Sequence, residues 1–179
     1  QFIGESPSAF HAVDTMKREL DARKYEQLLE GNTWHLSPGG KYYVIRGGTS
    51  LIAFRIPSAK IKSRVHGGFH GFQIMASHSD SPTFKVKENS EMEAEKAYVK
   101  LNVEKYGGML IAPWFDRPLS VAGRLIVREN GRIVSKLVNV DKDLLLIPSL
   151  AVHMDRQANE GHKYNVQKEL LPLYGMIGA

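Results

Sequence analysis

A histidine and an aspartate two positions apart, His78 and Asp80, are the residues of this sequence best suited to chemistry. In extended backbone, side chains alternate between two faces, so residues two apart point to the same side. One imidazole nitrogen can then bind a metal ion while the nearby carboxylate holds the ring or steers a water. Such a pair also arises often by chance, and a polar strand end that caps the next turn is the alternative.

The apolar run that precedes this pair, residues 72–76, predicts the element that positions it. A short and almost wholly apolar run is typical of a buried central strand. Such a strand delivers side chains to its C-terminal edge, where the ligand sites of α/β proteins usually lie. We therefore expect His78 and Asp80 at the edge of a central sheet.

The remaining histidines give weaker signals. His66 and His70 are four residues apart, but they lie in a glycine-rich stretch and are expected to be loop residues. His11 is expected to be structural, and His162 is expected to be solvated in a polar loop. The serines near His78 lie in no Gly-x-Ser-x-Gly motif, which argues against a serine nucleophile.

The composition limits the kinds of site that the chain can build. Its 179 residues suggest one domain or two small ones, and 42% hydrophobic residues suffice for a core. The chain has no Cys. This excludes disulfides, thiolate zinc sites, iron–sulfur clusters and cysteine nucleophiles. Any metal must therefore bind to His, Asp and Glu.

The charge and hydropathy patterns bear on partners and compartment. Lys and Arg number 24 against 19 Asp and Glu, but they are scattered singly rather than clustered, so we expect no nucleic-acid partner. No apolar run approaches the roughly 20 residues that span a bilayer, so we expect no membrane partner. No basic-then-apolar leader opens the chain, and the expected compartment is the cytoplasm.

The first part of the chain predicts helix followed by strands. Ser6 is the expected cap of a helix that runs to about residue 22. A second, shorter helical piece is expected at residues 25–30. Residues 41–46 and 50–56 are rich in β-branched and aromatic side chains and flank a Gly-Gly pair, which predicts an antiparallel hairpin.

The chain beyond Pro82 is expected to be mostly β. Residues 98–104 alternate strictly between apolar and polar side chains. Residues 124–128 and 132–138 flank an Asn-Gly dipeptide, the strongest short-range hairpin signal. A domain boundary is therefore expected near residues 82–87.

Five segments, taken in order, resemble the signatures of one known family. They are residues 6–13, 74–82 around His78, 106–108 with 114–124 (Trp-Phe-Asp-Arg-Pro-Leu), 147–153 (Ile-Pro-Ser-Leu-Ala-Val-His) and 165–172. Because the matches follow the family's order over nearly the whole chain, the sequence resembles the M18 family of zinc aminopeptidases, the aspartyl aminopeptidase-like enzymes.

The resemblance implies an enzyme that removes N-terminal residues from peptide substrates with two metal ions, normally zinc. His78 matches the family's first metal-ligating histidine. Asp80, the first expected catalytic residue, matches the carboxylate that orients it. His153, the second, matches a histidine that reaches a neighbouring subunit's active site, where it binds substrate or stabilises the oxyanion. An ordinary interface or surface histidine is the alternative for His153.

The implied fold is α/β, a zinc-exopeptidase-like catalytic domain with an inserted, mostly β oligomerisation domain. We expect the first part of the catalytic domain at residues 1–84, the inserted domain at 85–172 and the return to the catalytic domain at 173–179. The resemblance also implies a homo-oligomer, a dodecamer of dimers or trimers. Asp116 and Arg117 could form an internal ion pair, and by resemblance they shape the subunit interface.

The ligand set departs from the family pattern. A two-metal site needs about five or six protein ligands, and this chain offers one, His78. The family's bridging Asp, Glu-Glu pair, further Asp and final His all lie downstream of the matched region. We therefore expect the N-terminal portion of an aminopeptidase, inactive alone. The alternative is a non-catalytic oligomerisation or interaction fragment without a functional metal site.

Overall fold

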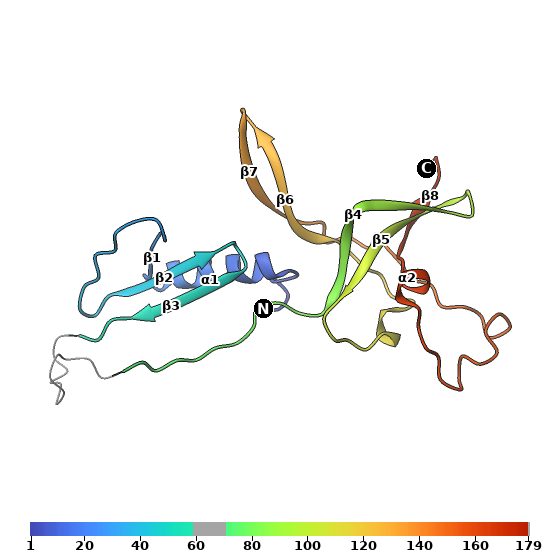
Figure 1. The fold of residues 1–179 in the computed structure, drawn as a ribbon, viewed down its shortest axis with the longest axis horizontal. Helices are drawn as coiled ribbons and strands as arrows, with labels where there is room; N and C mark the ends of the chain where they lie inside the picture. Colours follow the sequence, from blue (N-terminus) through green and yellow to red (C-terminus); the bar gives the residue numbers. More distant parts are fainter. Residues whose placement is uncertain (59–70, 179) are drawn as a thin grey trace. The chain divides into compact units, whose positions relative to one another are not determined.

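The structure is a computed structural model that describes residues 1–58 and 71–178. The chain divides into two compact units, whose elements are labelled in Figure 1. Unit 1 comprises Gln1–Asp80 and Gly123–Val138, and unit 2 comprises Ser81–Ala122 and Asn139–Ala179. The two histidines of the predicted glycine-rich loop, His66 and His70, lie outside the described residues.

Unit 1 contains one long helix, α1 (Ala9–Ala22), as the apolar spacing predicts. Its cap is Ser8 and not Ser6. The Ser8 backbone is extended with φ −140°, and its Oγ accepts a hydrogen bond from the His11 N–H at 3.4 Å. Ser8 lies three residues before His11, the spacing at which a cap hydroxyl reaches an otherwise unpaired helix amide. The buried side chains of the helix are Ala12, Val13 and Thr15.

The predicted hairpin of unit 1 is confirmed. Strands β2 (Lys41–Arg46) and β3 (Ser50–Arg55) pair antiparallel with Lys41 opposite Arg55. The turn contains Gly47 and Gly48, with φ of 62° and 75°. Glycine is required at this turn because both residues adopt left-handed backbone, which side chains with a Cβ disfavour.

The predicted helical piece at residues 25–30 is wrong. The structure has a short strand there, β1 (Glu26–Gln27), which pairs parallel with β2. The next residue, Leu28, donates its N–H to Tyr43 O at 2.8 Å. Tyr43 is fully buried, and its hydroxyl donates to Asp21 Oδ1 of α1 at 2.7 Å. Backbone bonds to a strand far away in the sequence thus replace the local helical bonds.

Unit 2 is built on an antiparallel sheet in the order β4-β5-β8. Its strands are β4 (Thr83–Ala94), β5 (Tyr98–Tyr106) and β8 (Leu173–Met176), and β5 confirms the predicted alternating strand. The short helices are η1 (Ala112–Trp114) and α2 (Val166–Glu169). The buried apolar side chains of the unit are Val103, Leu145, Ile147, Leu170 and Leu171.

The second predicted hairpin is also confirmed. Strands β6 (Ala122–Glu129) and β7 (Arg132–Asn139) form a two-stranded sheet. Asn130 and Gly131 at its tip have φ of 48° and 77°. Two successive left-handed residues are typical of the type I′ turn that the Asn-Gly signal predicts.

The prediction of a buried strand at residues 72–76 is wrong for the described chain. No strand forms there, and Phe72, Ile74 and Met75 are 83%, 81% and 100% exposed. A central strand is buried only when strands pair with it on both sides and other elements cover its faces. Within the described residues no strand pairs with this segment, so its apolar side chains face solvent.

Helix α1 and the sheets give the described chain the mixed α/β character that the sequence predicts. The expected domain boundaries at residues 1–84, 85–172 and 173–179, with an oligomerisation role for the second, stay predictions. In the part of the chain that the structure describes, no helix is long and apolar enough to cross a membrane.

Candidate functional site

The histidine and aspartate of the predicted metal motif contact each other in unit 1. His78 Nδ1 lies 2.8 Å from the backbone O of Asp80 and 3.2 Å from its Oδ1. Between them, Ser79 Oγ donates to Thr49 O at 3.1 Å, which ties the segment to the turn before β3. Because Nδ1 faces Asp80, the other ring nitrogen, Nε2, is the atom of His78 left for a metal ion.

This donor set fits one ligand of a zinc site and no more. A histidine whose second nitrogen contacts a carboxylate is the usual arrangement around protein-bound zinc. A structural or catalytic zinc needs at least three protein ligands. Among residues 1–58 and 71–178 no group of three or more His, Asp or Glu side chains could hold a metal. The ligand role of His78 and the orienting role of Asp80 stay predictions.

The third predicted site residue, His153, lies in a tight turn of unit 2. Ala151 O accepts hydrogen bonds from Met154 N at 2.8 Å and from Asp155 N at 3.2 Å, and these bonds close the turn around His153. The imidazole belongs to an exposed residue. The catalytic role of His153 in a neighbouring subunit's active site stays a prediction.

Asp116 contacts the chain just before this turn. Its N–H donates to Ile147 O at 2.9 Å, and its Oδ1 accepts from Ser149 N at 2.8 Å. Hydrogen bonds from the Ser149 side chain and backbone hold the pKa of Asp116 below its ordinary value. In the described residues the carboxylate therefore bonds to Ser149, and the expected ion pair with Arg117 does not form.

His162 is the functional candidate that the sequence does not reveal. The polar loop predicts a solvated side chain, but the imidazole is only 28% exposed. Its Nε2 lies 2.6 Å from Glu169 Oε1, and its Nδ1 lies 3.3 Å from Asp155 Oδ2. The N–H of Asn165 and, to a smaller extent, His162 lower the pKa of Glu169. No local spacing signals this cluster, because loop contacts bring its members together.

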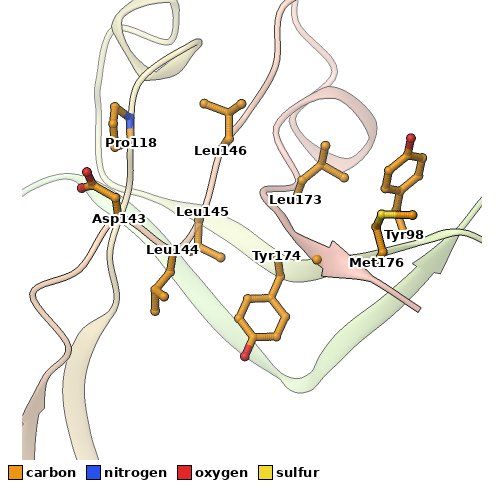
Figure 2. A pocket seen from close by; sticks show the side chains of 10 residues that line it. Tyr98, Pro118, Asp143, Leu144, Leu145, Leu146, Leu173, Tyr174 and Met176 are labelled. Carbon is orange, nitrogen blue, oxygen red and sulfur yellow. The ribbon is translucent and has the colours of Figure 1, made fainter. Parts of the chain in front are cut away.

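An open apolar pocket of about 440 Å³ lies elsewhere in unit 2, between residues 143–146 and β8. Figure 2 shows leucines from both segments in its lining, together with Asp143, Tyr98, Tyr174 and Met176. A surface of this kind offers packing area rather than acid–base or metal chemistry.

Comparison with known sequences gives a consistent result. The model of the aminopeptidase I zinc metalloprotease (M18) family matches residues 2–179. A probable M18 family aminopeptidase 2 of Clostridium acetobutylicum is 44% identical over 178 residues, which cover 98% of this chain and 40% of the relative. A protein described in the same words from Pseudomonas aeruginosa is 44% identical over 176 residues, covering 98% and 39%.

Solved structures agree with the sequence comparison. The chain resembles a chain in the cryo-EM structure of the Ape4 and Nbr1 complex with a TM-score of 0.89 at 38% identity, covering 99% of this chain and 33% of that one. It resembles Chaetomium thermophilum mApe1 with a TM-score of 0.81 at 34% identity, covering 96% and 38%. For the dodecamer of S. cerevisiae mApe1 the TM-score is 0.70 at 26% identity, covering 97% and 36%.

The chain spans about 40% of the length of the curated relatives that it matches. The family match nevertheless runs over almost all of its own residues, and it includes His78, Asp80 and His153. The family match and the similar relatives confirm the resemblance stated from the sequence motifs. The chain belongs to the M18 family of aminopeptidase I zinc metalloproteases.

Proposed function

We propose that this chain forms part of a zinc-dependent aminopeptidase that removes N-terminal residues from peptides. The observation that carries the proposal is the contact of His78 Nδ1 with Asp80, in a chain that matches the M18 family over residues 2–179. Zinc is the metal because the family is one of zinc metalloproteases. The described residues supply one ligand, so we propose that the others come from residues outside 1–179.

We propose a role in this reaction for His78, Asp80 and His153. His78 Nε2 would hold one of two zinc ions, and Asp80 would keep the ring in the tautomer that leaves Nε2 unprotonated. When bound, the pair of zinc ions supplies a polarised scissile carbonyl and a water of lowered pKa. His153, from a neighbouring subunit, would donate a hydrogen bond to the oxygen on which negative charge develops.

The same proposal accounts for the exposed apolar segment at residues 72–76. We propose that strands outside residues 1–179 pair with it on both sides and bring the remaining metal ligands beside His78. The exposure of Phe72, Ile74 and Met75, from 81% to 100%, supports this because burying such side chains is strongly favourable.

We propose a homododecamer as the assembled form. One solved relative, S. cerevisiae mApe1, is a dodecamer. In unit 2 the open apolar pocket beside β8 is rimmed by exposed side chains, among them Tyr174 and Met176. Such a surface gains free energy when a partner covers it.

A second function is supported by a separate observation. The described residues contain no group of three metal ligands, and unit 2 exposes apolar surface, so the chain could act as a non-catalytic oligomerisation module. The two proposals differ in one measurable property, because only the enzyme binds zinc tightly through His78.

The test compares the full-length protein with its His78→Ala variant. We expect the variant to lose bound zinc, measured by mass spectrometry of the metal, and to release N-terminal residues from peptides at least about 100-fold more slowly. His35→Ala, which removes another exposed histidine, serves as the matched control and should keep both properties. Full activity in His78→Ala contradicts the proposed metal site, and a wild type that holds no zinc and releases no N-terminal residues supports the oligomerisation module.

A further inference from the structure

We propose that Asp116 is a positioning residue for His153, because it fixes residues 147–149, the segment from which the His153 turn emerges. The inference rests on the proposed function of His153 and adds a residue to which no role in the reaction has been given. It concerns a segment of unit 2 that is held tightly at one end and carries an exposed histidine at the other.

The segment that leads to His153 is anchored as far as Ile147. Leu145 pairs with Leu119 through backbone hydrogen bonds of 2.9 and 3.0 Å. On the other side, Leu146 pairs with Leu173 through bonds of 3.2 and 2.8 Å. Ile147 is fully buried, and its carbonyl accepts the N–H of Asp116. The chain up to this carbonyl therefore has little freedom.

The carboxylate of Asp116 extends this anchoring by two residues. Residue 148 is a proline and has no N–H, so the next backbone donor is Ser149. Its N–H donates to Asp116 Oδ1 at 2.8 Å. The turn that holds His153 begins at Ala151, whose carbonyl accepts from Met154 N. Residue 150 alone separates the anchored position from the turn.

The geometry also explains why this residue is an aspartate. Asp116 has a φ of 55°, in the left-handed region that Asp and Asn adopt more readily than other residues with a Cβ. Glycine would adopt the same backbone but would supply no acceptor for Ser149. An aspartate satisfies both requirements at once, and asparagine satisfies both without the negative charge.

The other end of the turn is held independently. Asp155, two residues after His153, contacts His162 Nδ1 at 3.3 Å, and His162 contacts Glu169 of α2. Because Asp116 and His162 hold the chain on either side, the turn restricts the orientation of the His153 side chain. Loss of one anchor allows His153 a wider range of orientations. Displacement of a catalytic group by about 1 Å can lower the rate 100-fold.

The test is a double-mutant cycle in the full-length protein, with kcat and KM measured on a peptide substrate. Asp116→Ala should lower the same kinetic parameter as His153→Ala, by about tenfold. In the His153→Ala background it should lower that parameter no further. Asp116→Gly should behave like Asp116→Ala, because both lack the carboxylate, although only alanine strains the backbone. Asp116→Asn should restore at least half of the wild-type value.

Asp141→Ala is the matched control. Asp141 is also exposed and left-handed, with a φ of 50°, and its carboxylate makes no hydrogen bond within residues 1–58 and 71–178. We expect its removal to leave kcat and KM within a factor of two. A tenfold loss in this control would assign the effect to backbone strain and would overturn the proposal.

Hydrogen exchange of residues 147–154 supplies a readout that does not depend on activity. The amide of Ser149 should exchange faster in Asp116→Ala and Asp116→Gly but keep its protection in Asp116→Asn. Unchanged protection in all variants overturns the anchor. If the two losses in kcat or KM multiply in the double mutant, Asp116 acts independently of His153 and only the positioning role is overturned. If His153→Ala itself leaves kcat and KM unchanged, the proposed function of His153 is overturned, and the positioning role with it.

Discussion

His78 and Asp80 form the contact on which the proposed chemistry depends. The carboxylate oxygen lies 3.2 Å from Nδ1, so the proton of a neutral imidazole is favoured on that nitrogen and the lone pair on Nε2. The imidazole side chain is 81% exposed, so little desolvation opposes the entry of a metal ion. The pair is thus prepared to act as one ligand, and its affinity depends on the ligands that join it.

We predict that Asp80→Asn lowers the affinity for zinc by about tenfold, because a neutral amide polarises the imidazole less than a carboxylate does, while the backbone O of Asp80 still accepts the Nδ1 proton. Competition with a chelator of known affinity measures the change. Asp14→Asn, which removes a carboxylate paired with Arg18 in α1, is the control and should leave zinc affinity unchanged. Equal affinity in wild type and Asp80→Asn would falsify the orienting role.

We predict a pH-dependent contribution of Glu169 to stability. The Asn165 N–H, and to a smaller extent His162, lower the pKa of Glu169 in the folded state below its ordinary value of 4.5. Because the pKa is lower in the folded state, the ionised carboxylate stabilises the fold at pH values above the pKa of the unfolded chain. This stabilisation is lost as the pH falls through the pKa of the folded state. With the side chain 35% exposed, the contribution is under about 1 kcal/mol.

Urea unfolding of the wild type and Glu169→Gln tests this sign. The variant should be less stable at about pH 7, and the difference should shrink as the pH falls below the ordinary pKa of 4.5. A difference that is constant over this range would mean that the charge of Glu169 is not responsible.

At the scale of the elements, the hairpin of β6 and β7 depends on the backbone of its turn. Gly131 has a φ of 77°, and a Cβ at this position would meet no heavy atom within 4 Å. We predict that Gly131→Ala destabilises the hairpin by about 1 kcal/mol through backbone strain alone.

The matched control for this turn is Gly123→Ala in β6. A Cβ at Gly123 also meets nothing within 4 Å, and its φ lies outside the left-handed range. Its effect on the free energy of unfolding should stay within about 0.5 kcal/mol. Amide exchange along β6 and β7 measures both variants, and equal effects would show that backbone conformation is not the cause.

The elements that the sequence predicts correctly are those specified by neighbouring residues. Both hairpins follow from their Gly-Gly and Asn-Gly turns, and α1 follows from its apolar spacing. The element it assigns wrongly, at residues 25–30, is a strand whose pairing partner, β2, begins more than ten residues later. Local propensity cannot supply such a partner, and tertiary pairing overrides it.

Within the candidate site, too, contacts between neighbouring residues can be predicted from the sequence, whereas contacts between distant residues cannot. The contact between His78 and Asp80 can be predicted because the two residues are two positions apart. The contact between Asp116 and Ser149 joins residues 33 positions apart and follows only from the backbone bridges of the residues before Ile147. The His162 cluster likewise needs the loop to fold onto α2 before its charges meet.

At the scale of the whole molecule, the proposed enzyme requires more residues than these 179. We predict that the chain of residues 1–179 alone binds zinc weakly and releases no N-terminal residues, because a single histidine is a poor zinc site. The full-length protein should bind about two zinc ions per subunit. Equilibrium dialysis measures both, and tight zinc binding by residues 1–179 would contradict a shared ligand set.

Residues 72–76 also bear on how the protein is made. If the strands that cover this segment are synthesised after it, as we propose, Phe72, Ile74 and Met75 leave the ribosome without them. Each further hundred residues take roughly 5–20 s at ordinary rates of translation. Over that interval the segment is a short apolar stretch of nascent chain of the kind that chaperones hold. The rate of translation would then determine when the metal centre is complete, because His78 is synthesised before the other proposed metal ligands.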